Sequence, residues 1–390
     1  MSYIYKFDKL YSHENYGNYK WDRCKNNDIL PFWVAEMDFR CSPEIISALE
    51  KRVQNGYYGY TLPTDEVFQA IINYHYKNYQ VKVSQESIVF LSGLASGLFL
   101  APLAFTRPDE EVIILTPIYP PFLELSSANR HIIKVPLKFE KNAWNIDFNL
   151  FEKSITPKTK LFLFCNPHNP VGRVWSKEEI NKLLNICQKN NIIVCSDEVH
   201  CDLILSERLK HQSIFTVSDK YENLIFSLHS HSKAFNTPGL NCSYAILPDK
   251  ILRGKFTDPS LAYISLLNCF GYTSLISAYN ESSEWLKQLK DKLRENKKIL
   301  YDFLSNYPIL KSSEPEATYL SWIDVRDLQL KNPIAYFEKY GLAFSDGKKF
   351  GNPGFIRFNF ACPKSMLIKG LERFKIAIDA QINKLFSSSI

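Results

Sequence analysis

The sequence predicts an α/β fold in which a doubly wound, mostly parallel sheet is joined to a smaller α+β domain. Between about Ser42 and Leu247, short apolar runs alternate with amphipathic helical stretches, which is typical of βαβ units. The runs are almost continuously apolar, as expected of parallel strands buried on both faces. After about Trp285 this alternation stops. With 45% hydrophobic and 23% charged residues, the chain can bury a large core.

Taken in chain order, the apolar runs give the strands of the large sheet. The expected strands are Ser87–Leu91, Glu111–Thr116, Lys160–Cys165, Ile192–Ser196, Leu224–Leu228 and Ser243–Leu247. The clearest helix between them is Lys177–Lys189, because Ser176 and Glu179 form a capping box at its start. Ile88–Thr106 contains no charged residue and is as long as a membrane span. Its Ser, Gly and Pro residues favour a buried strand followed by a buried helix, so we expect no membrane partner.

The last third of the chain has a different character. Leu286–Phe303 is a long charged amphipathic helix, Thr318–Val325 and Gly354–Phe360 read as strands, and Pro363–Leu385 as a final helical region. We therefore expect a large domain over residues 42–284. A small domain would combine the N-terminal segment, residues 1–41, with the C-terminal residues 285–390.

Charge and cysteine content limit the possible partners and compartments. The net charge is +6, from 47 basic and 41 acidic residues that are interleaved, so we expect no nucleic-acid partner. The nine cysteines include no CxxC pair, and several lie in apolar runs, which argues against a disulfide scaffold and for a reducing compartment. The N-terminal residues form no apolar segment typical of a secretion signal. A cytoplasmic location is the resulting expectation.

Three polar groups follow three of the predicted strands. The segment Asn166-Pro-His-Asn-Pro-Val-Gly172 follows the strand that ends at Cys165. Asp197 follows the strand that ends at Ser196, and a segment ending in Lys233 follows the strand that ends at Leu228. Ligands of open α/β sheets bind outside the carboxyl ends of the strands, so an amide, a carboxylate and a lysine converge on one crevice. The Gly- and Ser-rich helix start at residues 92–97 is suited to a phosphate. Together these groups meet the requirements of pyridoxal phosphate: a lysine, an acid for the ring nitrogen, a donor and an anion site.

On these motifs the chain resembles fold-type I pyridoxal-phosphate enzymes of the class I/II aminotransferase superfamily over nearly its whole length. The motifs are Asn166-Pro-His-Asn-Pro-Val-Gly172, Ser196-Asp-Glu-Val-His-Cys-Asp202 and Ser230-His-Ser-Lys-Ala-Phe-Asn-Thr-Pro-Gly239. Within the superfamily it most resembles the MalY/PatB-type cystathionine β-lyases. That resemblance is carried by Lys20-Trp-Asp22, Pro31-Phe-Trp-Val-Ala-Glu-Met-Asp-Phe39, Tyr58-Gly-Tyr-Thr61 and Gly354-Phe-Ile-Arg-Phe-Asn-Phe360.

The resemblance implies roles for the residues that match its motifs. Lys233 matches the Schiff-base lysine, which also serves as general base at Cα. Asp197 matches the partner of the pyridinium nitrogen, and Tyr119 matches the aromatic residue that stacks on the ring; these three are the expected catalytic residues. Asn169 matches the donor to the phenolic oxygen of the cofactor.

Further residues match the phosphate and substrate sites. The backbone of Gly93, Leu94 and Ala95 matches the phosphate cup, and Ser230 and Ser232 add hydroxyl groups.

Arg357 matches the arginine that binds the substrate α-carboxylate, a role suited to a planar guanidinium. The loop that contains Trp33 and Ala35 would cover the substrate. Tyr60 matches a tyrosine that reaches the phosphate of a neighbouring subunit, which implies a homodimer with shared active sites.

Two positions depart from the aspartate-aminotransferase pattern. His200 stands where that pattern has a tyrosine near the cofactor, and Asn241 stands where it has a phosphate-binding arginine. Both departures are typical of the β-lyase branch. His200, Cys201, His229 and His231 could also be read as metal ligands. This interpretation is less favoured, because a position along the cofactor cleft accounts for the histidines more simply.

The expected activity is a C–S β-lyase acting on L-cystathionine or another S-substituted L-cysteine, giving a thiol, pyruvate and ammonia. An aminotransferase on the same scaffold is the alternative, and no single residue separates the two. A ligand-sensing regulator with an aminotransferase-like domain would carry an added winged-helix domain. The stretch before Trp33 is too short for one.

Overall fold

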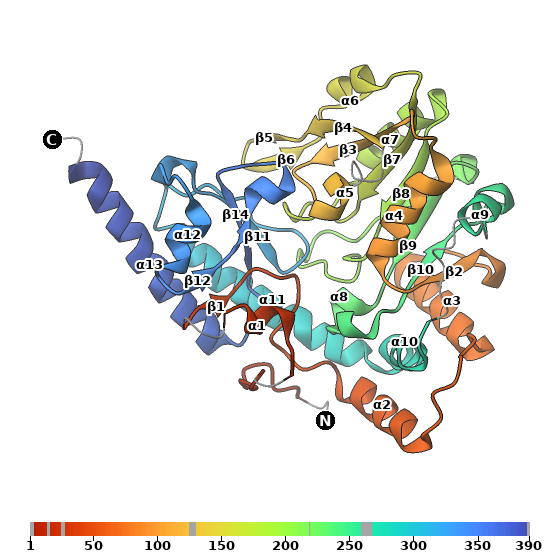
Figure 1. Ribbon diagram of the computed structural model, residues 1–390, viewed down its shortest axis with the longest axis horizontal. Coiled ribbons are helices and arrows are strands. Elements are labelled where there is room, and N and C mark those ends of the chain that lie inside the picture. Colours follow the sequence, from red (N-terminus) through yellow and green to blue (C-terminus); the bar gives the residue numbers. More distant parts are fainter. Residues whose placement is uncertain are drawn as a thin grey trace.

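The computed structural model describes residues 4–13, 16–24, 28–124, 130–217, 219–258 and 267–387. Figure 1 shows a large sheet flanked by helices and, beside it, a smaller sheet with two long helices, α11 (Ser283–Leu304) and α13 (Lys364–Ser387). This arrangement confirms the predicted fold class.

The large sheet has seven strands in the order β2-β10-β9-β8-β7-β3-β4. Only β10 runs antiparallel to its neighbours. The strands are β2 (Ile88–Leu91), β3 (Glu111–Thr116), β4 (His131–Pro136), β7 (Thr159–Cys165), β8 (Ile193–Asp197), β9 (Ile225–His229) and β10 (Ser243–Ile246). Each predicted strand is present with ends shifted by at most one residue. The sequence analysis missed β4, an edge strand whose apolar run is interrupted by Lys134.

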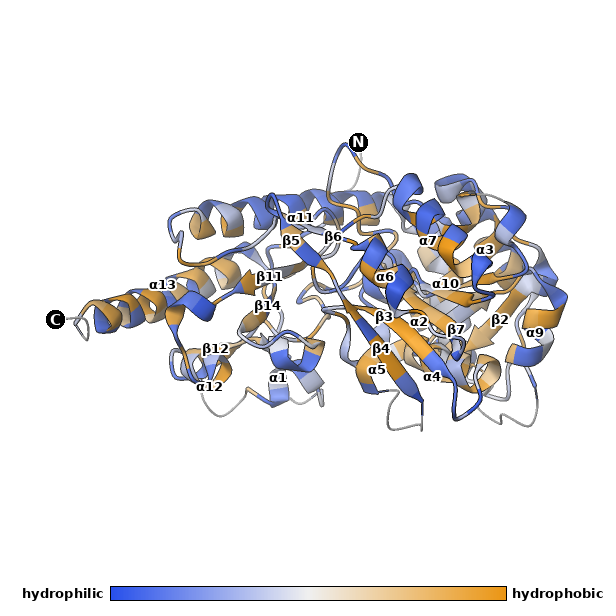
Figure 2. Ribbon diagram, turned by 90° about the horizontal axis from the view of Figure 1, so that it is seen from above, coloured by the Kyte–Doolittle hydropathy of each residue, from blue (hydrophilic) through white to orange (hydrophobic). Residues whose placement is uncertain are grey.

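Side chains of one strand alternate between two separate cores. Val112 and Ile114 of β3 pack into the core beneath α4 and α9, whereas Ile113 and Leu115 pack into the core beneath α6 and α7. This explains the continuous apolar runs, which Figure 2 shows as hydrophobic strands between more polar helices. The helices around the sheet are α2 (Pro43–Asn55), α3 (Asp65–Tyr79), α4 (Leu94–Phe105), α5 (Pro120–Glu124), α6 (Phe148–Ser154), α7 (Lys177–Lys189), α8 (Ser232–Phe235), α9 (Lys250–Phe256) and α10 (Cys269–Glu281).

The uncharged segment Ile88–Thr106 forms β2 and the buried helix α4. Within the described residues, no helix combines the length and apolar character that crossing a membrane requires. The capping box at Ser176 and Glu179 is formed as predicted.

The smaller part joins the two ends of the chain. A three-stranded sheet contains β11 (Leu320–Asp324), β14 (Phe355–Asn359) and β13 (Ser345–Asp346). β1 (Leu30–Pro31) pairs in parallel with β12 (Leu342–Ala343), so the N-terminal segment packs on the C-terminal third. The remaining elements are α1 (Tyr19–Asp22), α12 (Pro333–Glu338) and the hairpin of β5 (Lys138–Glu140) and β6 (Ala143–Asn145). Domain boundaries at residues 42 and 285 stay a prediction.

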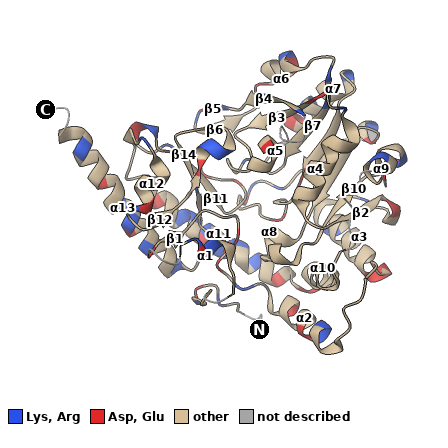
Figure 3. Ribbon diagram, in the orientation of Figure 1, with Lys and Arg blue, Asp and Glu red and all other residues tan. Residues whose placement is uncertain are grey.

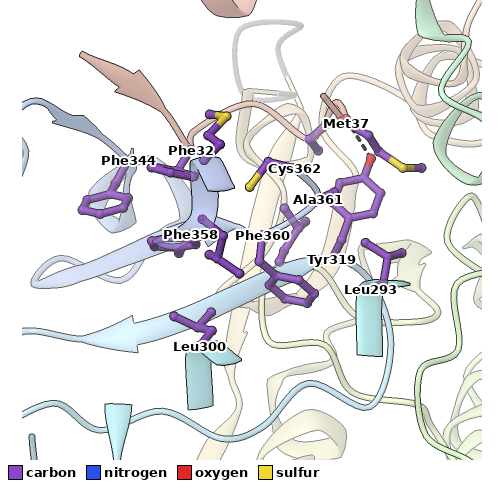
Figure 4. Packing of buried hydrophobic residues seen from close by; sticks show 14 of the residues in the cluster. Phe32, Met37, Leu293, Leu300, Tyr319, Phe344, Phe358, Phe360, Ala361 and Cys362 are labelled. Atoms are coloured by element: carbon purple, nitrogen blue, oxygen red, sulfur yellow. Dashed lines mark hydrogen bonds between the residues drawn. The ribbon is translucent and has the colours of Figure 1, made fainter. Parts of the chain in front are cut away.

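Aromatic packing fastens the N-terminal segment to this part. The rings of Phe32 and Phe358 stack with their centroids 4.6 Å apart, and Phe344 lies against Phe358 at 5.2 Å (Figure 4). Burying two or three such side chains contributes several kcal/mol, roughly 1.5–3 kcal/mol for each. The position of the loop after Phe32 is therefore set by the small sheet.

All nine cysteines are free, and eight of them are buried. Burial raises the pKa of most of these thiols, including Cys165, Cys187 and Cys195. Figure 3 shows Lys and Arg interspersed with Asp and Glu along α13 and the outer helices.

Candidate active site

The register of the parallel strands places three chain segments at one edge of the large sheet. Cys165 of β7 is paired with Asp197 of β8, and Asp197 is paired with Leu228 of β9. The residues after these positions therefore open together into a cavity of about 850 Å³. That volume lies in the upper part of the usual range for ligand sites, roughly 300–1,000 Å³.

The cavity brings together nearly all residues that the sequence analysis selected. They are Trp33, Ala35, Gly93, Leu94, Ala95, Tyr119, Asn169, Asp197, His200, Ser230, Ser232, Lys233 and Arg357. Tyr60 is the exception, because its side chain is 99% exposed and lies outside the cavity lining. Its predicted role in a neighbouring subunit stays a prediction.

Lys233 lies in the short helix α8, directly after β9. Its Nζ donates a hydrogen bond to the Ala35 carbonyl at 2.9 Å. Burial, reinforced by the Arg357 charge, lowers the pKa of Lys233 to about 8. About a tenth of this amine is therefore neutral and nucleophilic at pH 7, far more than for an ordinary lysine.

Asp197 ends β8 and is buried beneath the same cavity. One carboxylate oxygen accepts a hydrogen bond from the Val199 backbone N–H at 3.1 Å. Burial raises the pKa of Asp197 to about 7, although that hydrogen bond and the charge of Lys233 oppose the shift. A cationic hydrogen-bond donor beside this carboxylate would stabilise its charged form.

Arg357 of β14 crosses from the small sheet to the large one. Its guanidinium donates to Asn169 Oδ1 at 3.2 Å and to the Trp33 carbonyl at 2.9 Å, and it lies 4.7 Å from the Phe350 ring centre. Burial lowers the pKa of Arg357 only to about 10, so the group is positively charged at neutral pH. Since Asn169 accepts through its oxygen, its side-chain N–H groups are left to donate into the cavity.

The first turn of α4 faces the cavity with no side-chain cap among the described residues. Gly93 before it has φ of +141°, a conformation that side chains rarely adopt, and no atom lies within 4 Å of where a Cβ would stand. Gly97 lets the helix approach the sheet, because a Cβ there would lie 2.8 Å from Leu91. The backbone N–H groups of Leu94 and Ala95 thus form an anion seat.

Two serines and Asn241 complete that side of the cavity. The Ser230 hydroxyl donates to the Cys242 carbonyl at 2.7 Å and accepts from the Ser232 N–H at 3.1 Å, so it shapes the turn before Lys233. Asn241 lines the cavity where the aminotransferase pattern has an arginine.

The loop opposite the sheet is held by residues that the sequence analysis missed. Asn359 donates to the carbonyls of Val34 and Glu36 at 2.5 and 2.7 Å. Tyr319 donates to the Ala35 carbonyl at 3.1 Å, and Asn236 donates to the carbonyls of Met37 and Phe39. An available signal was Asn359 itself, a polar residue two positions after Arg357 in an otherwise apolar strand.

Of the three histidines expected to line the cofactor cleft, only His200 does so. His200 lines the cavity, and burial lowers its pKa to about 3, so it is neutral. His229 and His231 do not line it, which corrects the sequence analysis: they are buried against Ser227 and Ser274, respectively. Within the described residues no group of three or more potential ligands could hold a metal ion.

The cavity fits pyridoxal 5′-phosphate. Lys233 supplies the amine, and the buried Asp197 carboxylate has an environment that favours a cationic ring nitrogen. Asn169 has free donors, and the uncapped start of α4 supplies phosphate contacts. Tyr119, which lines the same cavity, can pack on a ring.

Fold and cavity together define a class: α/β proteins that carry a lysine, a carboxylate and an anion seat at the strand ends of a mostly parallel sheet. More specifically, the chain belongs to the aminotransferase class I and II family, whose model matches residues 27–374.

Individual relatives are similar over their full length. Cystathionine β-lyase PatB of Bacillus subtilis (strain 168) is 36% identical over 388 residues, covering 95% of this chain and 99% of that protein. Cystalysin from Treponema denticola, whose structure contains pyridoxal 5′-phosphate, has a TM-score of 0.93, with 32% identity and 97% and 100% coverage of the two chains. The PLP-bound C–S lyase from Staphylococcus hominis has a TM-score of 0.91, with 29% identity and 97% and 99% coverage.

Proposed function

We propose that this protein is a pyridoxal-phosphate-dependent C–S β-lyase. It converts an S-substituted L-cysteine and water into a thiol, pyruvate and ammonia, and L-cystathionine, giving homocysteine, is the first substrate to consider. The proposal is supported by the cavity geometry and by the similarity to cystathionine β-lyase PatB and to solved C–S lyases.

When bound, pyridoxal phosphate supplies an electron sink for negative charge that develops at the substrate Cα. The protein sets up that sink with Asp197, whose carboxylate keeps a ring nitrogen protonated. Asn169, whose oxygen is held by the hydrogen bond from Arg357, would donate its side-chain N–H groups to the bound cofactor. Tyr119, which directly precedes α5 and lines the cavity, would pack against the ring of the bound cofactor.

Arg357 orients the substrate. Its guanidinium is buried, charged and held by the Trp33 carbonyl, so it can bind the α-carboxylate in a bidentate manner. The carboxylate would replace weaker neutral partners such as the Ser345 hydroxyl, which is 3.3 Å away. Fixing the carboxylate restricts the directions in which the Cα–H bond can point.

Lys233 moves the proton. Its lowered pKa, about 8, makes the neutral amine available to remove the proton from Cα. A positioned base of this kind contributes about 10²–10⁴-fold in rate. Loss of the Cα proton then drives departure of the thiolate from Cβ.

The single observation that carries the proposal is the presence of Lys233, Asp197 and Arg357 in one cavity, with Asp197 and Arg357 buried. The test is to supply purified protein and pyridoxal phosphate with L-cystathionine, without any keto acid, and to measure pyruvate and free thiol. Continuous formation of both supports the lyase. An amino-group transfer that stops after one turnover and resumes when a keto acid is added would instead indicate the aminotransferase.

We also propose a homodimer with shared active sites, in a cytoplasmic setting. The segment around Tyr60 supports the dimer, since Tyr57, Tyr58, Tyr60 and Leu62 are all exposed in the single chain. The nine free cysteines support a reducing compartment. Sedimentation of the native protein gives the oligomeric state, and a monomer that is fully active would contradict shared sites.

A further inference from the structure

The outer end of the cavity carries a pair of opposite charges that the proposed chemistry does not use. Arg23, directly after α1, lies 3.6 Å from Glu338 at the end of α12, and both residues line the cavity. In Figures 1 and 2, α1 and α12 both lie in the part of the molecule that contains the small sheet. The two side chains are 50% and 35% exposed, so ligands can reach them.

Trp33 connects this outer pair with Arg357, the residue that would bind the α-carboxylate of the substrate. Its backbone carbonyl accepts the hydrogen bond from Arg357, while its ring lies 4.7 Å below the Arg23 guanidinium. The indole N–H donates to the Lys20 carbonyl at 3.1 Å, and the buried Lys20 ammonium is paired with Asp38 at 2.7 Å. The outer charges are thus held at a fixed place relative to Arg357, on the other side of one tryptophan.

Stability does not explain the outer pair. An ion pair that is half exposed contributes at most about 1 kcal/mol to folding. Its chemistry matches a zwitterion, because a guanidinium binds a carboxylate through two parallel hydrogen bonds and a carboxylate accepts hydrogen bonds from an ammonium group.

Resting on the proposed function, we propose that Arg23 and Glu338 form a subsite for a second amino-acid head group, carried by the leaving thiol of the substrate. Arg23 binds the distal carboxylate and Glu338 binds the distal ammonium. The preferred substrates are then S-substituted cysteines with a zwitterion at both ends, as in L-cystathionine, rather than short S-alkyl cysteines.

The experiment compares kcat/KM for three substrates. They are L-cystathionine, S-(3-carboxypropyl)-L-cysteine, which lacks only the distal amino group, and S-ethyl-L-cysteine, which lacks the whole distal head group. The proteins are the wild type, Arg23→Gln, Glu338→Gln and the matched control Arg208→Gln, at an exposed site outside the cavity.

The expected result is a pattern across substrates. Arg23→Gln lowers the preference for L-cystathionine over S-ethyl-L-cysteine by about tenfold, the size expected for one partly exposed charged hydrogen bond. It lowers the preference for the carboxypropyl substrate as well. Glu338→Gln lowers the preference only for L-cystathionine, and Arg208→Gln changes none of these ratios.

Contrary outcomes separate this inference from the proposed function. If the wild type cleaves S-ethyl-L-cysteine but both variants slow all three substrates equally, the outer pair only shapes the cavity and the subsite is refuted. Unchanged ratios in both variants refute it too. A wild type that forms pyruvate from none of the three substrates refutes the lyase itself, and the subsite falls with it.

Discussion

The cavity has two walls that are built in different ways. The sheet wall carries Asn169, Asp197 and Lys233, each placed by the end of a buried strand. The loop wall, residues 33–38, contains no regular structure and is held by side chains such as Asn359 that bind its backbone carbonyls. The sheet wall provides the chemistry, and the loop wall fixes the substrate against it. Substitutions can disrupt each wall separately.

The largest effect is expected on the sheet wall, from Lys233→Ala. Loss of the amine that donates to the Ala35 carbonyl removes both the base and the covalent anchor, so pyruvate formation falls by about 10⁴-fold. Steady-state pyruvate assays measure this, together with the visible absorbance of the bound cofactor. Retention of both the absorbance and the turnover would remove Lys233 from its role.

Asp197→Asn tests the same wall with less disruption. The amide keeps the shape and can still accept from Val199, but it cannot hold a proton on a ring nitrogen by charge. We expect the cofactor to stay bound and kcat to fall by about 10²–10³-fold, the usual size of one lost electrostatic contact in a transition state. A variant with near-normal kcat would show that the charge of Asp197 is dispensable.

Asn359→Ala tests the loop wall. The Val34 carbonyl loses the donor from Asn359, the Glu36 carbonyl keeps only Lys20, and the Ala361 N–H loses its acceptor, so the free energy of unfolding decreases by about 2 kcal/mol. Because the loop and Arg357 share Trp33, we expect kcat/KM to fall about tenfold, mainly through KM. Urea unfolding and steady-state kinetics measure the two effects, with the exposed Asn383→Ala as control. An unchanged KM would mean that the loop holds its position without Asn359.

The smallest effect is a pH dependence on the sheet wall. In cofactor-free protein, Lys233 reacts only as the neutral amine, and its pKa is lowered to about 8. Raising the pH from about 7 to about 8 therefore increases the neutral fraction and the rate of cofactor capture about fivefold. Asp197, with a pKa raised to about 7, becomes anionic over an overlapping range, and its charge raises the pKa of Lys233, which opposes part of this increase. Stopped-flow absorbance measures the rate, and a rate that falls with pH would contradict this assignment.

The comparison also explains what the sequence could predict. Strands buried on both faces are visible as apolar runs, and the residues after them must meet at one sheet edge, so Asn169, Asp197 and Lys233 could be selected together. The edge strand β4 escaped because Lys134 interrupts its run.

The loop wall could not be predicted in the same way. The contacts of Asn359 with Val34 and Glu36 join residues more than 300 positions apart, and only the packing of the small sheet brings them together. His229, expected at the cofactor cleft as the alternative to a metal site, instead ends β9 and is buried beside Ser227. No sequence motif singles out Arg23, because the proposed role of this residue depends on its contacts with Glu338 and Trp33 in the folded chain.

The buried, unpaired cysteines have a consequence for a protein that would release a thiol at every turnover. Homocysteine and similar products reduce accessible disulfides and form mixed disulfides with exposed thiolates. This chain has no disulfide to lose, and burial raises the pKa of thiols such as Cys165 and Cys195, which suppresses the reactive thiolate. Eight of the nine cysteines are thus shielded from the product thiol by burial, and the fold contains no disulfide that this thiol could reduce.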